Sequence, residues 1–284
     1  MKSVAVVPMA LISSILVFPQ PAAWGQCSDA GVCTIGEEHA ASGHALSLAY
    51  SYGSSGKDDN LTYHTIRFEG SYHFFENADI YFGIPFSRQS GPAGSASGVG
   101  DLTILWNQII VRNEATTLRI QGGVKLATGS VNSNGLPQAY QSGLGTNDIL
   151  LGASFEMRGT TLALAYQVTT GRSANGATRL RRGDDLMLRA GFTHRDQEFT
   201  LGGELLAIKR IQESSVLQTV QPETFVNVPN SNQLQLNLVG RMTYLFTERY
   251  QLQAEGAVAL LKRDTNVDGL KRAFTLSLGV AYLM

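Results

Sequence analysis

Charged residues are scarce in this chain, and neither sign dominates. Asp, Glu, Lys and Arg make up 16% of its 284 residues, against roughly 25% in typical soluble domains. The formal net charge is −1, so the chain lacks the basic excess by which proteins attract nucleic acid. No nucleic-acid partner is expected.

Long apolar runs are also missing. Beyond residue 25 no stretch approaches the ~18 consecutive apolar residues of a transmembrane helix, and the mean hydropathy is only −0.03. A chain that crosses lipid without such helices has to close into a β-barrel, because every backbone N–H and C=O needs a partner there. A membrane location therefore requires a barrel.

Cysteine is nearly absent, and the two present, Cys27 and Cys33, lie close together near the N-terminus. In an oxidising compartment such a pair is expected to close a small disulfide loop. Neither the CxxC spacing of redox proteins nor the ligands of a structural metal site accompany them. We expect a Cys27–Cys33 disulfide, no metal and no cofactor.

Residues 1–25 have the pattern of a secretory signal peptide. Lys2 supplies the basic start, residues 4–18 form the apolar core, and small residues precede a cleavage point at Gln26. An amphipathic anchor that stays on the protein is the alternative. The predicted organisation is a signal peptide at 1–25, a periplasmic segment at 26–43 and a barrel at 44–284.

From residue 44 onward the sequence alternates in polarity with period two, which is typical of strands whose two faces meet different surroundings. In one run Ile66 and Phe68 lie on one face, and Arg67 and Glu69 lie on the other. About twelve runs occur, an even number as in bacterial barrels. They are 44–53, 62–74, 79–88, 100–111, 117–127, 147–157, 161–170, 184–194, 198–210, 233–246, 250–262 and 272–284.

Two of these runs alternate poorly, because apolar residues fall on the polar parity: Leu105, Ile109 and Val111 in one run, and Leu206 and Ile208 in the other. Elsewhere the apolar parity is large and aromatic, while the other is rich in Ala, Gly, Ser and Thr. A soluble β-sandwich or lipocalin-like barrel is the rival fold, but its polar face would carry Lys and Glu. The pattern favours an all-β protein, a transmembrane antiparallel up-and-down barrel.

Short turns alternate with long connections along the chain, the asymmetry of outer-membrane barrels with short periplasmic turns and longer external loops. The long connections are 54–61, 88–99, 128–146, 171–183, 211–232 and 263–271. The final run resembles the C-terminal strand that the barrel-assembly machinery recognises, although Met284 stands where Phe or Trp is usual. The cell outer membrane is the predicted location, with its lipid and that machinery as partners.

A barrel of twelve strands has a narrow lumen, so the charged residues on the inward parity are the candidates for a solute path. Both signs occur in similar number, and the simplest interpretation is that they pair across the lumen and brace the wall. These candidates are Arg67, Glu69, His73, Arg119, Lys125, Asp148, Asp185, Arg189, Glu204, Arg241 and Glu255.

Residues 98–155 carry a set of glycine motifs. A Gly-x-Gly-Asp contains Gly100 and Asp101, a strand-end motif contains Gly123, Lys125, Thr128 and Gly129, and a glycine-rich stretch contains Gly145 and Asp148. In these motifs the sequence resembles the outer-membrane barrels of the MetA-pathway phenol-degradation, or putative transporter, family, although Ala127 replaces a frequent Pro. The resemblance implies uptake of small, often hydrophobic or aromatic compounds.

The loop 127–146 lies between two of these motifs, and its glycines permit a close approach to the barrel mouth. We expect this loop to constrict the pore, and we expect Lys125 and Asp148, inward on adjacent strands, to form an ion pair. The predicted function is a channel or transporter for a small-molecule solute.

Two other classes of function stay open. A lipid hydrolase needs a Ser and a His together on the lipid-facing side; His64 and His194 lie there without an evident Ser partner, so an enzyme is not predicted. A structural or adhesive barrel is the other, since the loop 211–232 is rich in apolar residues: Val216, Leu217, Val220, Phe225 and Val226.

Overall fold

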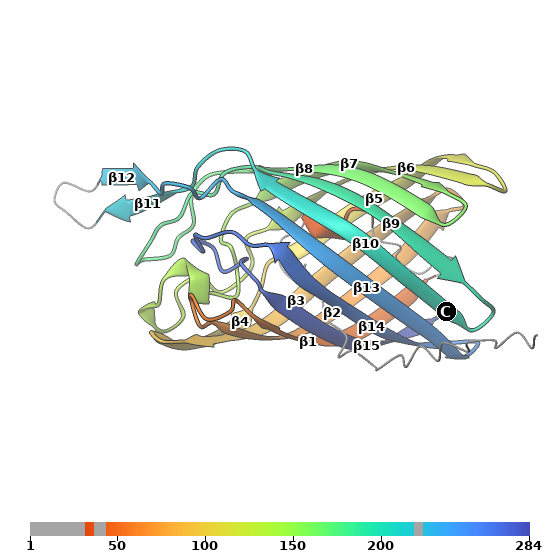
Figure 1. Ribbon diagram of the computed structural model, residues 1–284, viewed down its shortest axis with the longest axis horizontal. Coiled ribbons are helices and arrows are strands. Elements are labelled where there is room, and N and C mark those ends of the chain that lie inside the picture. The colour runs from red at the N-terminus through yellow and green to blue at the C-terminus, as the bar shows by residue number, and fades with distance from the viewer. Residues whose placement is uncertain (1–31, 37–43, 219–223) are drawn as a thin grey trace, which may run out of the picture.

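The alternating runs form a single closed sheet in the computed structural model, which describes residues 32–36, 44–218 and 224–284 (Figure 1). The strands of the wall are β1 Ala45–Ser54, β2 Thr62–Phe75, β3 Ala78–Gly91, β5 Leu102–Arg112, β6 Thr116–Leu126, β7 Asp148–Met157, β8 Thr160–Thr169, β9 Asp185–Arg195, β10 Phe199–Arg210, β13 Leu234–Thr247, β14 Tyr250–Leu261 and β15 Phe274–Leu283. Three short strands of the described residues lie outside these twelve: β4 Gly94–Val99, β11 Ser215–Gln218 and β12 Thr224–Asn227. The described residues also form three turns of 3₁₀ helix: η1 Val32–Thr34, η2 Ser133–Gly135 and η3 Gln138–Tyr140.

Consecutive wall strands are antiparallel neighbours, as β2 and β3 are. The pairing of β1 with the last strand β15 closes the barrel. The sheet contains 13 strands, of which β4 only extends β3 beyond its pairing with β5, leaving a closed barrel of 12. The predicted fold is confirmed.

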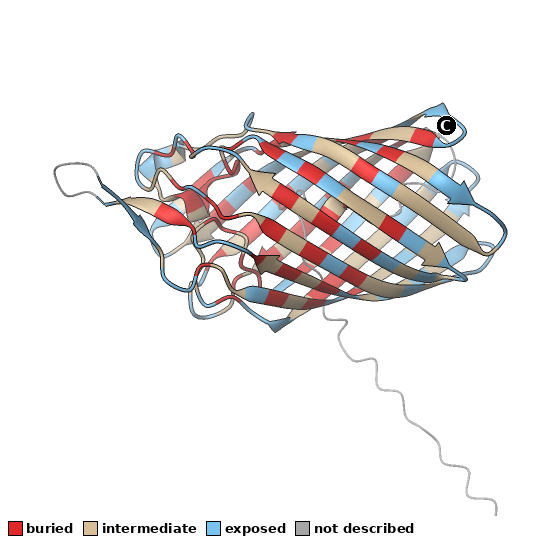
Figure 2. Ribbon diagram, turned by 90° about the horizontal axis from the view of Figure 1, so that it is seen from above, coloured by how far each residue is buried: buried red, intermediate tan, exposed pale blue. Residues whose placement is uncertain are grey.

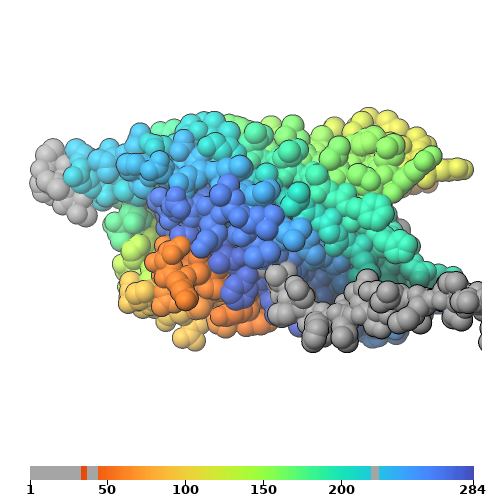
Figure 3. All heavy atoms as spheres, viewed as in Figure 1, coloured from red at the N-terminus to blue at the C-terminus, as the bar shows by residue number. Residues whose placement is uncertain are grey.

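Two connections expected to be long loops contain strands instead. Over 88–99, β3 continues to Gly91 and turns directly into β4, so the wall extends further at this point. Within 211–232, β11 and β12 pair as a hairpin that projects beyond the barrel at the long-loop end (Figures 1 and 3). The strands β4, β11 and β12 have only six, four and four residues, too few to show the period-two pattern.

The barrel is apolar on its outside, as the parity predicts. Leu48, Phe68, Leu164, Phe192 and Leu278 are each between 41% and 57% exposed, whereas the residues between them are buried or partly buried (Figure 2). Large apolar side chains that point outward from a closed sheet suit a lipid environment. Within the described part of the chain no helix is long and apolar enough to cross a membrane.

Candidate functional site

Three loops close the barrel at the long-loop end, which the usual asymmetry of such barrels predicts to be the external end. The loop between β6 and β7 folds inward, so that Gln138 and Gln141 are almost completely buried. It is tied to the loop between β8 and β9, where the Asn175 amide donates to the carbonyl oxygen of Val131 at 2.6 Å. It also reaches the loop between β14 and β15, because a Cβ on Gly269 would lie 2.7 Å from the carbonyl oxygen of Ala139.

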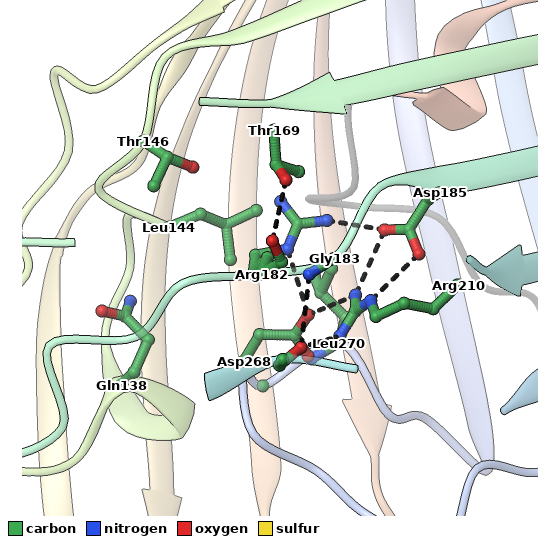
Figure 4. A network of polar contacts seen from close by, with 12 residues as sticks. Gln138, Leu144, Thr146, Thr169, Arg182, Gly183, Asp185, Arg210, Asp268 and Leu270 are labelled. Carbon is green, nitrogen blue, oxygen red and sulfur yellow. Dashed lines mark hydrogen bonds and ion pairs between the residues drawn. The ribbon is translucent and has the colours of Figure 1, made fainter. Parts of the chain in front are cut away.

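Buried ion pairs join these loops to the wall (Figure 4). Arg182 lies 3.2 Å from Asp148, 2.7 Å from Asp185 and 3.2 Å from Asp268. Arg210 contacts Asp185 at 3.1 Å and Asp268 at 2.7 Å. Arg263 lies 3.4 Å from Asp185. We call these six residues, Asp148, Arg182, Asp185, Arg210, Arg263 and Asp268, the mouth cluster.

The charges of the mouth cluster balance, with three arginines and three aspartates that are at most 5% exposed. Burial alone would raise the pKa of Asp268, but the nearby charges of Arg210, Arg182 and Arg263 outweigh burial and hold that pKa well below its usual range. Asp268 is therefore ionised at any physiological pH. The ion pairs of the mouth cluster hold the loops against the wall, and each charge in the cluster is compensated by the others.

The glycine motifs meet at the base of the β6–β7 loop, around the Asp101 carboxylate. One oxygen accepts from the backbone N–H of Gly129 at 3.0 Å, and the other accepts from that of Leu144 at 2.6 Å. A Cβ on Gly129 would lie 2.7 Å from Cα of Gly143, so the two ends of the loop pack backbone to backbone. The motifs thus anchor the loop that enters the mouth.

Other motif residues support the same anchor. The Thr128 hydroxyl accepts from the N–H of Leu102 at 2.9 Å, and Gly145 has a φ of +72°, which glycine adopts without strain. A Cβ on Gly100 would lie 2.6 Å from the ring of Pro85, and one on Gly123 would lie 2.1 Å from the carbonyl oxygen of Ile104.

Lys125 and Asp148 are cross-strand partners between β6 and β7, as their predicted positions require. The Lys125 amine lies 3.8 Å from Asp101, and Asp148 binds Thr146, Gln167 and Arg182. Each of the two residues therefore belongs to a larger buried network, and the expected direct ion pair between them stays a prediction.

Residues 32–36 lie inside the barrel, although the sequence assigns them to a periplasmic segment. The N–H of Gly36 donates to the Gln121 side chain at 2.8 Å, and Arg189 donates to the carbonyl oxygen of Cys33 at 2.7 Å. Ile35 is completely buried. A Cβ on Gly152 would lie 2.5 Å from the Ile35 side chain, so the small residue there makes room for it.

An apolar ring on the inner wall surrounds this segment. The ring explains part of the poor alternation in two predicted runs, since Leu105, Leu206 and Ile208 point inward and are almost completely buried. Val111 is exposed instead, and it follows a register shift in β5. With Cys33 and Ile35 they form one apolar cluster, whose other wall residues are Tyr81, Leu150, Ala163, Ala165, Met187, Val239 and Ala257.

A cavity of about 320 Å³ lies between this segment and the short-turn end of the barrel. Its charged side chains are paired: Arg67 with Glu69 at 2.7 Å, Arg119 with Glu156 at 3.8 Å, and Arg241 with both Glu204 and Glu255 at 2.9 and 2.8 Å. These distances are those expected of charges that brace the wall. The cavity is therefore lined by side chains of both charges.

The predicted inward charges therefore divide into four places. Arg67, Glu69, Arg119, Glu204, Arg241 and Glu255 line the cavity. Arg189 holds residues 32–36, while Lys125, Asp148 and Asp185 belong to the closed mouth. His73 lies at the short-turn end, where its N–H donates to the His44 ring at 3.2 Å.

Sequence reasoning missed Arg182, Arg263 and Asp268 of the mouth cluster, because residues in loops follow no period. Arg210 is the last residue of β10 and has the same parity as Glu204, so the alternation of the sequence already predicts that it points inward. The apolar residues that blurred the alternation were the signal for the ring around Ile35.

The remaining sequence predictions concern a disulfide, the outward-facing histidines and the absence of enzyme activity. Cys27 and Val220 lie outside the described residues, so the Cys27–Cys33 disulfide stays a prediction. His64 forms a hydrogen bond with the Tyr50 hydroxyl at 2.7 Å, and within the described ranges no Ser forms a hydrogen bond with either His64 or His194. The absence of an enzyme activity likewise stays a prediction.

A closed antiparallel barrel with an apolar exterior and a charged lumen defines an outer-membrane β-barrel. In fold the chain is similar to the COG4313 outer membrane channel from Pseudomonas putida F1, with a TM-score of 0.65 and 18% identity over 88% of this chain and 98% of that one. The NanC porin has a TM-score of 0.49 at 13% identity, covering 85% and 100%. No family model and no curated protein matches the sequence, so the resemblance to the MetA-pathway family stays a prediction.

Proposed function

We propose that this protein is an outer-membrane channel for small solutes, held closed by its own loops and by residues 32–36. One observation carries the proposal. The lumen is obstructed by segments that leave the wall, whereas in barrels of ~8 strands the wall side chains fill the interior themselves. Segments of that kind are able to move without unfolding the barrel.

The lining supports a small solute with both polar and apolar parts. A solute from the cavity side meets paired charges first and then the apolar ring around Ile35. The resemblance to the MetA-pathway family points to hydrophobic or aromatic compounds, and the apolar ring is consistent with them. The COG4313 protein of similar fold is described as an outer membrane channel, which agrees with the proposed class.

Planar-bilayer recording tests the proposal with a deletion of residues 131–142, the inner part of the β6–β7 loop. We expect a larger single-channel conductance, because this deletion removes the buried Gln138 and Gln141 from the mouth. Glu248→Gln, in an exposed periplasmic turn, is the control and should conduct as the unaltered protein does. Equal conductance of the deletion variant and the unaltered protein would contradict the proposal.

Solute choice is tested separately in proteoliposomes that contain the deletion variant. We expect benzoate-sized aromatic compounds to enter faster than neutral sugars of similar mass. The opposite order would reject the aromatic assignment and leave the channel function intact.

A further inference from the structure

Three successive cross-strand rows on the outer face of β1 to β4 mark the upper edge of the lipid-facing band. The first row is Tyr50, Ile66, Phe86 and Val99. All four are apolar or aromatic and between 42% and 49% exposed. The third row toward the long loops is Ser54, Thr62, Ser90 and Ser95, four hydroxyl side chains.

The row between them, Tyr52, His64, Arg88 and Ser97, we call the boundary row. It lies one step beyond the apolar band, on the segment coloured orange to amber at the long-loop end in Figure 3. Tyrosines of this kind are enriched at the level of lipid headgroups. A charged side chain at such a position meets the polar surface of the membrane rather than its hydrocarbon.

Arg88 has no protein counter-ion within the described residues. It alternates with buried neighbours and is itself exposed, and no hydrogen bond or ion pair of its guanidinium is present in that part of the chain. The nearest acidic residues along the adjacent loop, Asp58 and Asp59, pair with Lys262 and Lys271. The charge of Arg88 is therefore left for a group outside the protein.

His64 lies directly opposite Arg88 in the register of β2 and β3, so their Cβ atoms are about 5 Å apart. The His64 ring is fixed by the Tyr50 hydroxyl at 2.7 Å and by the Tyr52 ring at 5.1 Å between centroids. When the phenol donates to Nδ1, the ring proton is on Nε2, which is then a hydrogen-bond donor. Two adjacent donors on one row, one of them an arginine, form a site for an anion with several acceptor oxygens.

We propose that Arg88 and His64 bind a phosphate group of an outer-leaflet lipid. Guanidinium groups bind phosphate with two parallel hydrogen bonds, and a phosphate between Arg88 and His64 would offset the repulsion of two donors placed opposite each other. Tyr52 of the boundary row and the apolar row beneath it receive the lipid's sugar and acyl parts. The site is on the outer surface and is independent of the proposed channel.

Native mass spectrometry of the full protein in detergent tests the site, with lipid A as the probe. Arg88→Gln should weaken lipid A binding about tenfold, the loss expected for one charge-assisted contact, and His64→Gln should weaken it less. Arg88→Lys keeps the charge and should retain part of the binding. Arg249→Gln, exposed in a periplasmic turn, should leave the affinity unchanged.

Three further arms identify the ligand. Lipid A with its phosphates removed should bind the unaltered protein as weakly as intact lipid A binds Arg88→Gln. Competition by millimolar inorganic phosphate would overturn the assignment in favour of a free anion, and equal affinity for phosphatidylglycerol would overturn the assignment to outer-leaflet lipid. Unchanged lipid A affinity in Arg88→Gln, with a folded barrel shown by its heat-modifiable migration on gels, would overturn the proposal itself.

Discussion

The side chains that close the mouth are charged, although a buried charge without a partner costs several kcal/mol. The mouth cluster resolves this by balance, since each carboxylate contacts at least one guanidinium and each guanidinium at least one carboxylate. Removal of one member therefore leaves an excess charge on the others. The position of the loops depends on all six residues together.

Asp268→Asn is expected to destabilise the folded protein by about 3–5 kcal/mol, the usual cost of breaking a buried pair by removing one partner. The reason is that Arg182 and Arg210 each lose a contact with Asp268. The free energy of unfolding in urea measures the effect, and Asp264→Asn, exposed on the same loop, should change it by less than about 0.5 kcal/mol. The double change Asp268→Asn with Arg263→Gln restores the charge balance and should recover part of the loss; no recovery would mean that charge balance is not what holds the cluster.

The same residue predicts how the mouth responds to acid. Because the folded-state pKa of Asp268 is lowered, its contribution to stability is fully present above the ordinary Asp pKa of about 3.9. That contribution is lost progressively as the pH falls from there toward the lowered value. The stability difference between the unaltered protein and Asp268→Asn should be the same at pH 7 as at about pH 4.5. A difference that disappeared over this interval would show that Asp268 becomes protonated there.

At the scale of elements, the sequence predicts the wall well and the obstructions of the lumen poorly. A strand imposes period two on every residue, so Ile66 and Arg67 reveal their faces without any structure. Loops impose no period, and the contact of Arg182 with Asp268 joins parts of the chain 86 positions apart in sequence. Residues 32–36 are too few to show a periodic pattern. The apolar residues on the inward parity of the wall, which pack around them, were the one indication in the sequence of an apolar segment in the lumen.

Ile35 is expected to help hold residues 32–36 in the lumen through its apolar contacts, beside the hydrogen bonds of Gly36 and Cys33. Ile35→Ala removes most of these contacts, and Ile35→Asp places an unpaired carboxylate in the apolar ring. Single-channel conductance should therefore rise from the unaltered protein to the Ala variant and again to the Asp variant. Leu205→Ala, which alters a lipid-facing neighbour of Leu206, is the control. A conductance that is the same in all four proteins would show that this segment does not obstruct the channel.

At the scale of the whole molecule, the barrel has an apolar outside and a polar inside, the reverse of a soluble protein. On β1 to β4 the outer band ends in hydroxyl side chains toward the long loops, and the chain reaches Met284 at the short-turn end (Figure 1). Both features fit a barrel whose long loops face away from the cell. The lipid site, the closed mouth and the hairpin β11–β12 would then all lie on the external side.

This orientation predicts which residues a membrane-impermeant maleimide reaches on intact cells. Thr224→Cys, exposed in the projecting hairpin, should be labelled at once, whereas Glu248→Cys, exposed in a short turn, should be labelled only after the outer membrane is permeabilised. The protein with its own two cysteines gives the background. Labelling of Glu248→Cys on intact cells, with Thr224→Cys protected, would reverse the orientation. The cavity with its paired charges would then open to the outside, and residues 32–36 would obstruct entry into the channel rather than exit from it.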